Sequence, residues 1–338
     1  MKRVLLIIQL ILILILEGCS LIPSPDKVNG IYYWRTTYDP STEEKWFLNE
    51  HEIRRMYIRF FDVVIDDKKN IVPNATIQFN QNPSNELEYV PTVFITNEAM
   101  LAMKGKEGDY AHLITKRVHA MMMKNKIEKV HEVQLDCDWT TTSQNAFFIL
   151  CDSIKNILHP KGFQLSSTIR LHQLRQEKPP VDKGVLMVYN TGAIKNPSTY
   201  NSILDISDVK HYLKGIKTQI PMDFAFPVFS WSIWFQDDNF VAIIRHTDLL
   251  NSDLYEDLGN NRYRVLKSHN LEGHYIYEGD IFRLERPRYS DIMKVKEVVE
   301  KAFHTDGRQH SVILYHLDNS NLSKYSSNEI ENLYHSSH

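Results

Sequence analysis

Residues 129–139 read KVHEVQLDCDW, and this stretch decides the predicted fold. Taken together with the other predicted strands, it belongs to a set of apolar runs without clean alternation, which is typical of parallel strands that are covered on both faces. In a strand, successive side chains point to opposite faces. We therefore expect Asp136 and Asp138 to share one face, while Cys137 meets a helical layer on the other.

Similar short, β-rich runs recur on both sides of this stretch and alternate with helix-like segments. The predicted strands are 30–38, 55–65, 89–96, 129–139, 164–173, 184–190, 222–231 and 310–317. The predicted helices are 41–53, 97–126, 143–158, 207–216 and 290–303. Eight strands that alternate with helices predict an α/β fold, the (β/α)8 TIM barrel.

One segment interrupts this alternation. Residues 232–287 contain hairpin-like runs between the seventh strand and its helix, so we predict a β-rich insertion over the barrel mouth. We take 30–328 as the barrel domain and 329–338 as a C-terminal tail.

We expect the N-terminus to carry a targeting signal. Lys2 and Arg3 precede an apolar run over 4–16, which suits a secretory signal and is too short to span a membrane comfortably. Leu-Glu-Gly-Cys at 16–19 resembles the lipobox of bacterial lipoproteins, although its glutamate departs from the usual pattern. The resemblance implies a signal peptide over 1–18, lipidation of Cys19, a tether over 19–29 and anchoring to a membrane of the bacterial cell envelope. The alternative is an ordinary signal anchor with a chance cysteine.

Composition excludes several functional classes. The chain is 43% hydrophobic and 24% charged with a net charge of −3, which argues against a nucleic-acid partner. HExxH, CxxC, P-loop and GxGxxG patterns do not occur, so we expect no metal and no cofactor. Cys137 and Cys151 are expected to be buried thiols rather than a disulfide framework. Protein partners cannot be read from the sequence.

In a barrel of this type, functional residues lie at the carboxyl ends of strands. The candidates there are Trp34, Arg35, Arg59, Asp62, Asp136, Asp138, Trp139, Arg170, His172, Tyr189, Trp231, His316 and Asp318. Two neighbouring carboxylates repel, so Asp136 or Asp138 should gain a proton, a ligand or an arginine partner. The candidate partners are Arg35, Arg59 and Arg170. The alternative is a structural ion-pair network that fills the barrel.

Residues 133–140, VQLDCDWT, resemble the chitinase-type glycoside hydrolase motif Asp-x-Asp-x-Glu. Asp136, Asp138 and Trp139 match it, but Thr140 stands where the proton-donating glutamate would be. A hydroxyl group cannot replace a carboxylic acid in protonating a glycosidic oxygen, so the chitinase mechanism cannot be carried over. The segments SSTIRLHQ (166–173) and VLMVYNTG (185–192) also resemble a bacterial barrel family of unknown function.

Two hypotheses for function follow. The first is a glycoside-hydrolase-like enzyme acting on an envelope glycan, with Asp136 and Asp138 as catalytic carboxylates. Its proton donor would be Glu285 or Asp318. His316 could form an oriented acid and base pair with Asp318, and the alternative is a hydrogen-bonded histidine without a catalytic role. The second is a non-catalytic barrel that binds a glycan or scaffolds a surface complex. In both, a carbohydrate ligand would stack on tryptophan side chains, some of which are expected to fill the core instead.

Overall fold

The computed structural model describes residues 27–335 except 217–219, 246 and 304–308. The predicted signal peptide, Cys19 and most of the predicted tether lie outside the described residues. Within the described chain, no helix is both long enough and apolar enough to cross a membrane.

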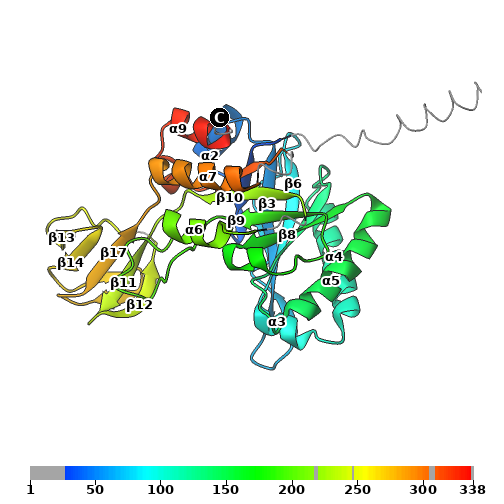
Figure 1. The fold of residues 1–338 in the computed structure, drawn as a ribbon, viewed down its shortest axis with the longest axis horizontal. Coiled ribbons are helices and arrows are strands. Elements are labelled where there is room, and N and C mark those ends of the chain that lie inside the picture. The colour runs from blue at the N-terminus through cyan, green and yellow to red at the C-terminus, as the bar shows by residue number, and fades with distance from the viewer. Residues whose placement is uncertain (1–26, 217–219, 246, 304–308, 336–338) are drawn as a thin grey trace, which may run out of the picture.

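Eight parallel strands of the described chain close into a barrel, which confirms the predicted fold (Figure 1). Closure is complete because β1 pairs with both β3 and β18. The barrel strands are β1 (Gly30–Tyr33), β3 (Arg55–Ile65), β6 (Glu88–Ile95), β7 (Glu132–Asp136), β8 (Gln164–Arg170), β9 (Lys183–Met187), β10 (Met222–Pro227) and β18 (Val312–Tyr315). Three short strands, β2 (Thr37–Tyr38), β4 (Ile71–Asn74) and β5 (Gln78–Phe79), lie outside this ring.

Helices cover the outer face of the barrel. They are α2 (Thr42–Glu50), α3 (Asn97–Ala102), α4 (Glu107–Lys124), α5 (Gln144–Leu158), α6 (Ile206–Leu213), α7 (Tyr289–Phe303), α8 (Asn319–Leu322) and α9 (Ser327–Tyr334), with short 3-10 turns at His159–Lys161 and Leu171–Arg175. Ser41 and Glu44 form a capping box that begins α2. The helix predicted over 97–126 is two helices, because Gly105 between them has a φ of +82°, a left-handed conformation that ends a helix.

The predicted boundary between the barrel domain and a C-terminal tail is wrong, because an ordered helix crosses it. The division at residue 328 falls inside α9, which packs on the barrel through the fully buried Leu333 and Tyr334. The Tyr334 hydroxyl donates a hydrogen bond to the Gly30 carbonyl at 3.0 Å. This helix therefore packs against the barrel beside the first residue of β1.

The predicted insertion is present between β10 and α7 and forms a sheet of its own. Its strands are β11 (Trp231–Gln236), β12 (Asn239–Ile244), β13 (Tyr255–Gly259), β14 (Arg262–Val265) and β17 (Ile281–Glu285), with a hairpin of β15 (His269–Leu271) and β16 (His274–Ile276). Trp234, Tyr263, Val265 and Phe282 belong to a separate hydrophobic core in this sheet. The insertion projects to one side of the barrel (Figure 1).

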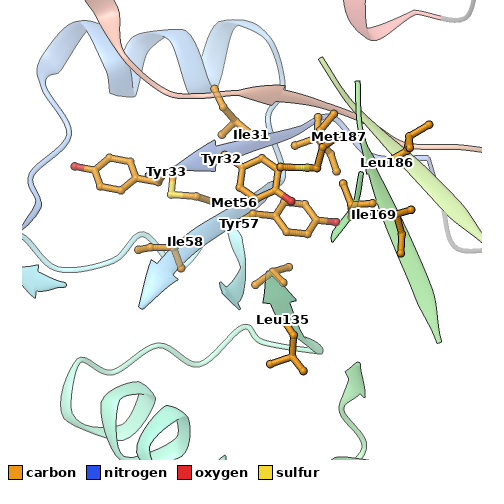
Figure 2. Packing of buried hydrophobic residues seen from close by; sticks show 14 of the residues in the cluster. Ile31, Tyr32, Tyr33, Met56, Tyr57, Ile58, Leu135, Ile169, Leu186 and Met187 are labelled. Carbon is orange, nitrogen blue, oxygen red and sulfur yellow. The ribbon is translucent and has the colours of Figure 1, made fainter. Parts of the chain in front are cut away.

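Aromatic and polar side chains fill the barrel interior. The rings of Tyr32 and Tyr57 lie next to each other with centroids 5.0 Å apart, close to Met187 (Figure 2). The Tyr32 hydroxyl donates to Gln134 Oε1 at 2.8 Å. A buried polar side chain needs a hydrogen-bond partner, and Tyr32 and Gln134 satisfy each other in this way. Gln134 lies two residues before Asp136 on β7, so the two side chains point to the same face of the strand.

An ionic layer closes the amino ends of the strands. Lys183 Nζ lies 2.8 Å from Glu132 Oε2 and 2.9 Å from Asp223 Oδ2, and both carboxylates are almost fully buried. Arg55 pairs with Glu88 at 3.0 Å nearby. This ionic layer lies at the opposite end of the barrel from Asp136 and does not include it.

Candidate functional site

Asp136 forms the polar centre of the carboxyl end of the barrel, which we call the mouth. It is the last residue of β7 and is only 4% exposed. Its Oδ1 accepts hydrogen bonds from Thr168 Oγ1 at 2.6 Å and from Arg170 Nη2 at 2.9 Å. Of the three arginines that were predicted as partners, Arg170 is therefore the one that forms an ion pair with Asp136.

Tyr189 lies beside this pair. Burial, together with the neighbouring Tyr315, raises the pKa of the Tyr189 hydroxyl well above its ordinary value. The side chain is therefore a neutral phenol that can donate a hydrogen bond at the mouth.

Four aromatic rings from three segments of the chain form a continuous row at the mouth. Ring centroids are 6.0 Å apart for Trp34 and Tyr315, 5.6 Å for Tyr315 and Phe229, and 5.1 Å for Phe229 and Trp231. Trp34, Tyr315 and Trp231 are partly exposed, and the Arg59 guanidinium lies over the Trp34 ring at 5.5 Å. We call these four residues the aromatic row. It offers apolar ring faces beside the Asp136 and Arg170 pair.

Asp138 lies at the rim rather than at the centre. Strand β7 ends at Asp136, so the expected alternation does not continue to Asp138. The Asp138 side chain is 56% exposed, and its Oδ1 lies 3.3 Å from Nε2 of the half-exposed His172. Asp136 and Asp138 thus do not form one buried carboxylate pair.

Trp139 differs from its predicted role as a binding residue. It is fully buried, and its ring packs edge-on against Phe148 of α5 with centroids 5.5 Å apart. Once the strand has ended, the chain turns and places this side chain between barrel and helix, where no ligand can stack on it. Thr140, the next residue, donates its backbone N–H to Ser143 Oγ at 2.9 Å in the turn that begins α5.

Three predicted binding residues use their charged groups in ion pairs or hydrogen bonds with other residues of the protein. Arg35 binds the Glu44 carboxylate and the Leu317 carbonyl and so joins α2 to the end of β18. Asp318 caps α8 by accepting the Ser320 N–H at 3.0 Å. Asp62 is ion-paired with Arg59 within β3. Of these, only the Arg59 and Asp62 pair contacts the aromatic row.

His316 is a partly buried histidine next to Tyr315, and its Nδ1 has no hydrogen-bond partner. Burial lowers the pKa of His316 from 6.5 to about 4, and the cations Arg35 and Arg245 lower it further against the opposing effect of Asp318. The imidazole is therefore neutral at pH 7, and it is not paired with Asp318 as an acid and base would be.

This shift predicts an acid-sensitive contribution to stability. Since the pKa of His316 is lowered on folding, the stabilisation is complete above pH 6.5 and is lost as the pH falls toward 4, by at most about 3 kcal/mol. Chemical denaturation of wild type and His316→Gln from pH 7 to 4 measures it, with His159→Gln as the exposed control. The His316→Gln protein should lose less stability over this range, and an equal loss in both proteins would contradict the assignment.

Glu285, the predicted proton donor, is fully buried. Its carboxylate lies 2.8 Å from Arg283 Nε and accepts hydrogen bonds from Trp231 Nε1 at 2.6 Å and Ser202 Oγ at 2.6 Å. Trp231 is the first residue of β11 and not the end of the seventh strand, which stops at Pro227. Glu285 therefore positions one ring of the aromatic row and ties the insertion to the loop before α6.

The mouth thus brings together Trp34, Arg59, Asp62, Asp136, Arg170, Tyr189 and Trp231, with Asp138 and His172 at its rim. Sequence reasoning missed Phe229 and Tyr315. Both lie within predicted strands close to residues that were selected, and the aromatic character of the runs 222–231 and 310–317 was the available signal. In the part of the chain that the structure describes, no cluster of three or more metal-ligating side chains is found.

The fold has counterparts among solved structures. No family model and no curated protein matches the chain. A C-terminal domain of a putative chitinase from Desulfitobacterium hafniense matches with a TM-score of 0.56 at 9% identity, over 91% of this chain and 99% of that one. A GH18 chitinase from Cycas revoluta in complex with (GlcNAc)3 matches at 0.54 and 9% identity, over 90% and 99%. The spore cortex-lytic enzyme SleL of Bacillus cereus matches at 0.51 and 11% identity, over 92% and 75%. The chain therefore has the barrel fold of GH18 chitinase-type proteins.

Proposed function

We propose that this protein is a lipid-anchored envelope protein that binds a glycan at the barrel mouth without cleaving it. The observation that carries the proposal is the aromatic row beside the Asp136 and Arg170 pair. Sugar rings present C–H faces that pack on aromatic rings and hydroxyl groups that exchange hydrogen bonds with charged side chains. The GH18 neighbours, one of them a chitinase in complex with (GlcNAc)3, support a carbohydrate as the ligand class.

Binding without cleavage is favoured because four of the acids near the mouth are already engaged within the protein. Asp62 and Asp136 accept hydrogen bonds from arginines, Asp318 caps a helix and Glu285 is enclosed by Arg283, Trp231 and Ser202. Hydrolysis of a glycosidic bond needs a carboxylic acid that can give a proton to the leaving oxygen. Thr140 cannot supply this proton.

A glycoside-hydrolase-like enzyme is the second candidate, and one observation favours it. Asp138 and His172 are half exposed at the rim and lie within 3.3 Å of each other, so a substrate could reach them. In this case Asp138 would take the catalytic role, because it is the more accessible carboxylate of the motif.

The two candidates make different predictions for a panel of envelope and dietary glycans. Binding is measured by calorimetry and cleavage by release of reducing ends. We expect saturable binding without reducing ends, and Trp34→Ala or Asp136→Asn should weaken it by about tenfold to a hundredfold, or about 1.4–3 kcal/mol. Trp46→Ala, at a tryptophan that is 62% exposed on α2, is the matched control and should bind as wild type does. Release of reducing ends that Asp138→Asn abolishes would establish the enzyme instead.

Anchoring is tested separately at Cys19. Since the thiol is the group that would be acylated, Cys19→Ala should abolish lipidation and leave a soluble protein or an uncleaved precursor. Detergent-phase partitioning of labelled cells measures this, with Cys151→Ala as the cysteine control. Unchanged partitioning and mass of the Cys19→Ala protein would contradict the lipoprotein assignment.

A further inference from the structure

A second candidate binding site lies outside the barrel, between the β3–β4 hairpin and α4. It is a cavity of about 440 Å³, a volume typical of pockets that bind small molecules. Its walls are apolar and include Phe61 of β3, Ile71 and Pro73 of β4, and Leu113 of α4. Leu113 is 59% exposed, which is unusual for a large apolar side chain beside a cavity.

The charges around this cavity have one sign. The only charged side chains in its lining are Lys116 and Arg117, both cations on α4. Within the described part of the chain, neither forms an ion pair. An anion in this cavity would therefore meet attraction without a competing carboxylate.

Arg117 is held in place but is not fully satisfied. Its Nη2 donates to Thr76 Oγ1 at 2.9 Å, and its guanidinium lies 5.0 Å from the Phe61 ring centre. Its Nε is buried with no hydrogen-bond partner. A buried donor that lacks a partner is rare and costs free energy, so a ligand that supplies an acceptor after a small side-chain shift would be favoured.

We propose that this cavity binds a single-chain amphipathic carboxylate of the free fatty acid type. The alkyl chain packs on the apolar walls, and the carboxylate faces Lys116 and Arg117. A purely apolar ligand would leave both cations without an anion, and a purely polar anion would leave the apolar walls in water. This site is independent of the glycan-binding proposal, because it lies on α4 and not at the mouth.

Decanoate titrated by calorimetry into the full chain in phospholipid nanodiscs tests the proposal, with the titration of empty nanodiscs subtracted. We expect saturable one-to-one binding, with decanol weaker by at least tenfold because it lacks the negative charge. Decanol that binds as tightly as decanoate, or decanoate uptake that does not saturate, overturns the proposal.

Variants on α4 locate the binding. Lys116→Gln should weaken decanoate binding about tenfold, and Ala120→Trp should abolish it by filling the cavity, which Ala120 lines. Lys124→Gln, an exposed lysine of the same helix outside the cavity, should have no effect. Because these three side chains are exposed, folding should be retained, and thermal unfolding verifies this. If Lys116→Gln and Lys124→Gln change the affinity for decanoate by the same factor, the proposal is wrong. If the protein binds anionic vesicles but not decanoate, the site is a membrane contact and the proposal is also wrong.

Discussion

Replacing Lys183 with methionine should lower the free energy of unfolding by about 3–5 kcal/mol. Burial alone would lower the pKa of Lys183, but Glu132 and Asp223 outweigh it and hold the pKa well above its ordinary value. The ammonium is therefore charged in the folded protein and neutralises two buried carboxylates at 2.8 and 2.9 Å. Removing it leaves both carboxylates buried without a cation. Chemical denaturation monitored by circular dichroism measures the loss.

A surface pair provides the control for this prediction. Lys155 lies 3.1 Å from Asp182, and both side chains are partly exposed, so Lys155→Met should cost less than about 1 kcal/mol. Adding Glu132→Gln to Lys183→Met should recover part of the loss, because it removes one of the two uncompensated charges. Equal losses for Lys155→Met and Lys183→Met would show that the ionic layer does not stabilise the barrel.

Replacing Glu285 with alanine should destabilise the protein by a similar amount, about 3–5 kcal/mol, and should also weaken glycan binding. Arg283, which is fully buried, would keep its charge without a carboxylate, and Trp231 would lose the acceptor that orients its ring. The two effects come from the same carboxylate. Unfolding curves and calorimetric titration of a bound glycan measure them.

Glu285→Gln separates this positioning role from proton donation. The amide retains the shape and an acceptor for Trp231 but loses the charge, so it should be less stable than wild type and should still bind glycan. Glu256→Ala is the control on the same sheet, since Glu256 pairs with Arg264 in an exposed ion pair and should cost less than about 1 kcal/mol. A stable Glu285→Gln protein that binds glycan but has lost a wild-type hydrolytic activity would restore Glu285 as the proton donor.

Local patterns were sufficient to predict the barrel. Each of the eight barrel strands is marked within about ten residues by an apolar run and flanking turn residues, and α2 is marked by the capping box at Ser41 and Glu44. The β-rich insertion was recognised in the same way, as a break in the alternation. Asp136 could be selected because the carboxyl ends of barrel strands converge, whatever the details of packing.

The exact ends of the strands limited the prediction of the site. Period-two alternation is informative only while the strand continues, and β7 ends at Asp136. Beyond this residue the backbone direction depends on how α5 packs, and so Asp138 reaches the rim while Trp139 enters the core. Neither outcome could be read from residues 133–140 alone.

By itself, the sequence determined the order of the eight barrel strands, the position of the insertion and the presence of a threonine, Thr140, after Trp139, because each of these depends on neighbouring residues only. The tertiary structure decided which side chains meet: Asp136 with Arg170, Glu285 with Trp231, and the four rings of the aromatic row. These partners are separated by 34, 54 and up to 281 positions in the chain. The physical reason is that burial and pairing energies act between groups that only barrel closure brings within contact distance.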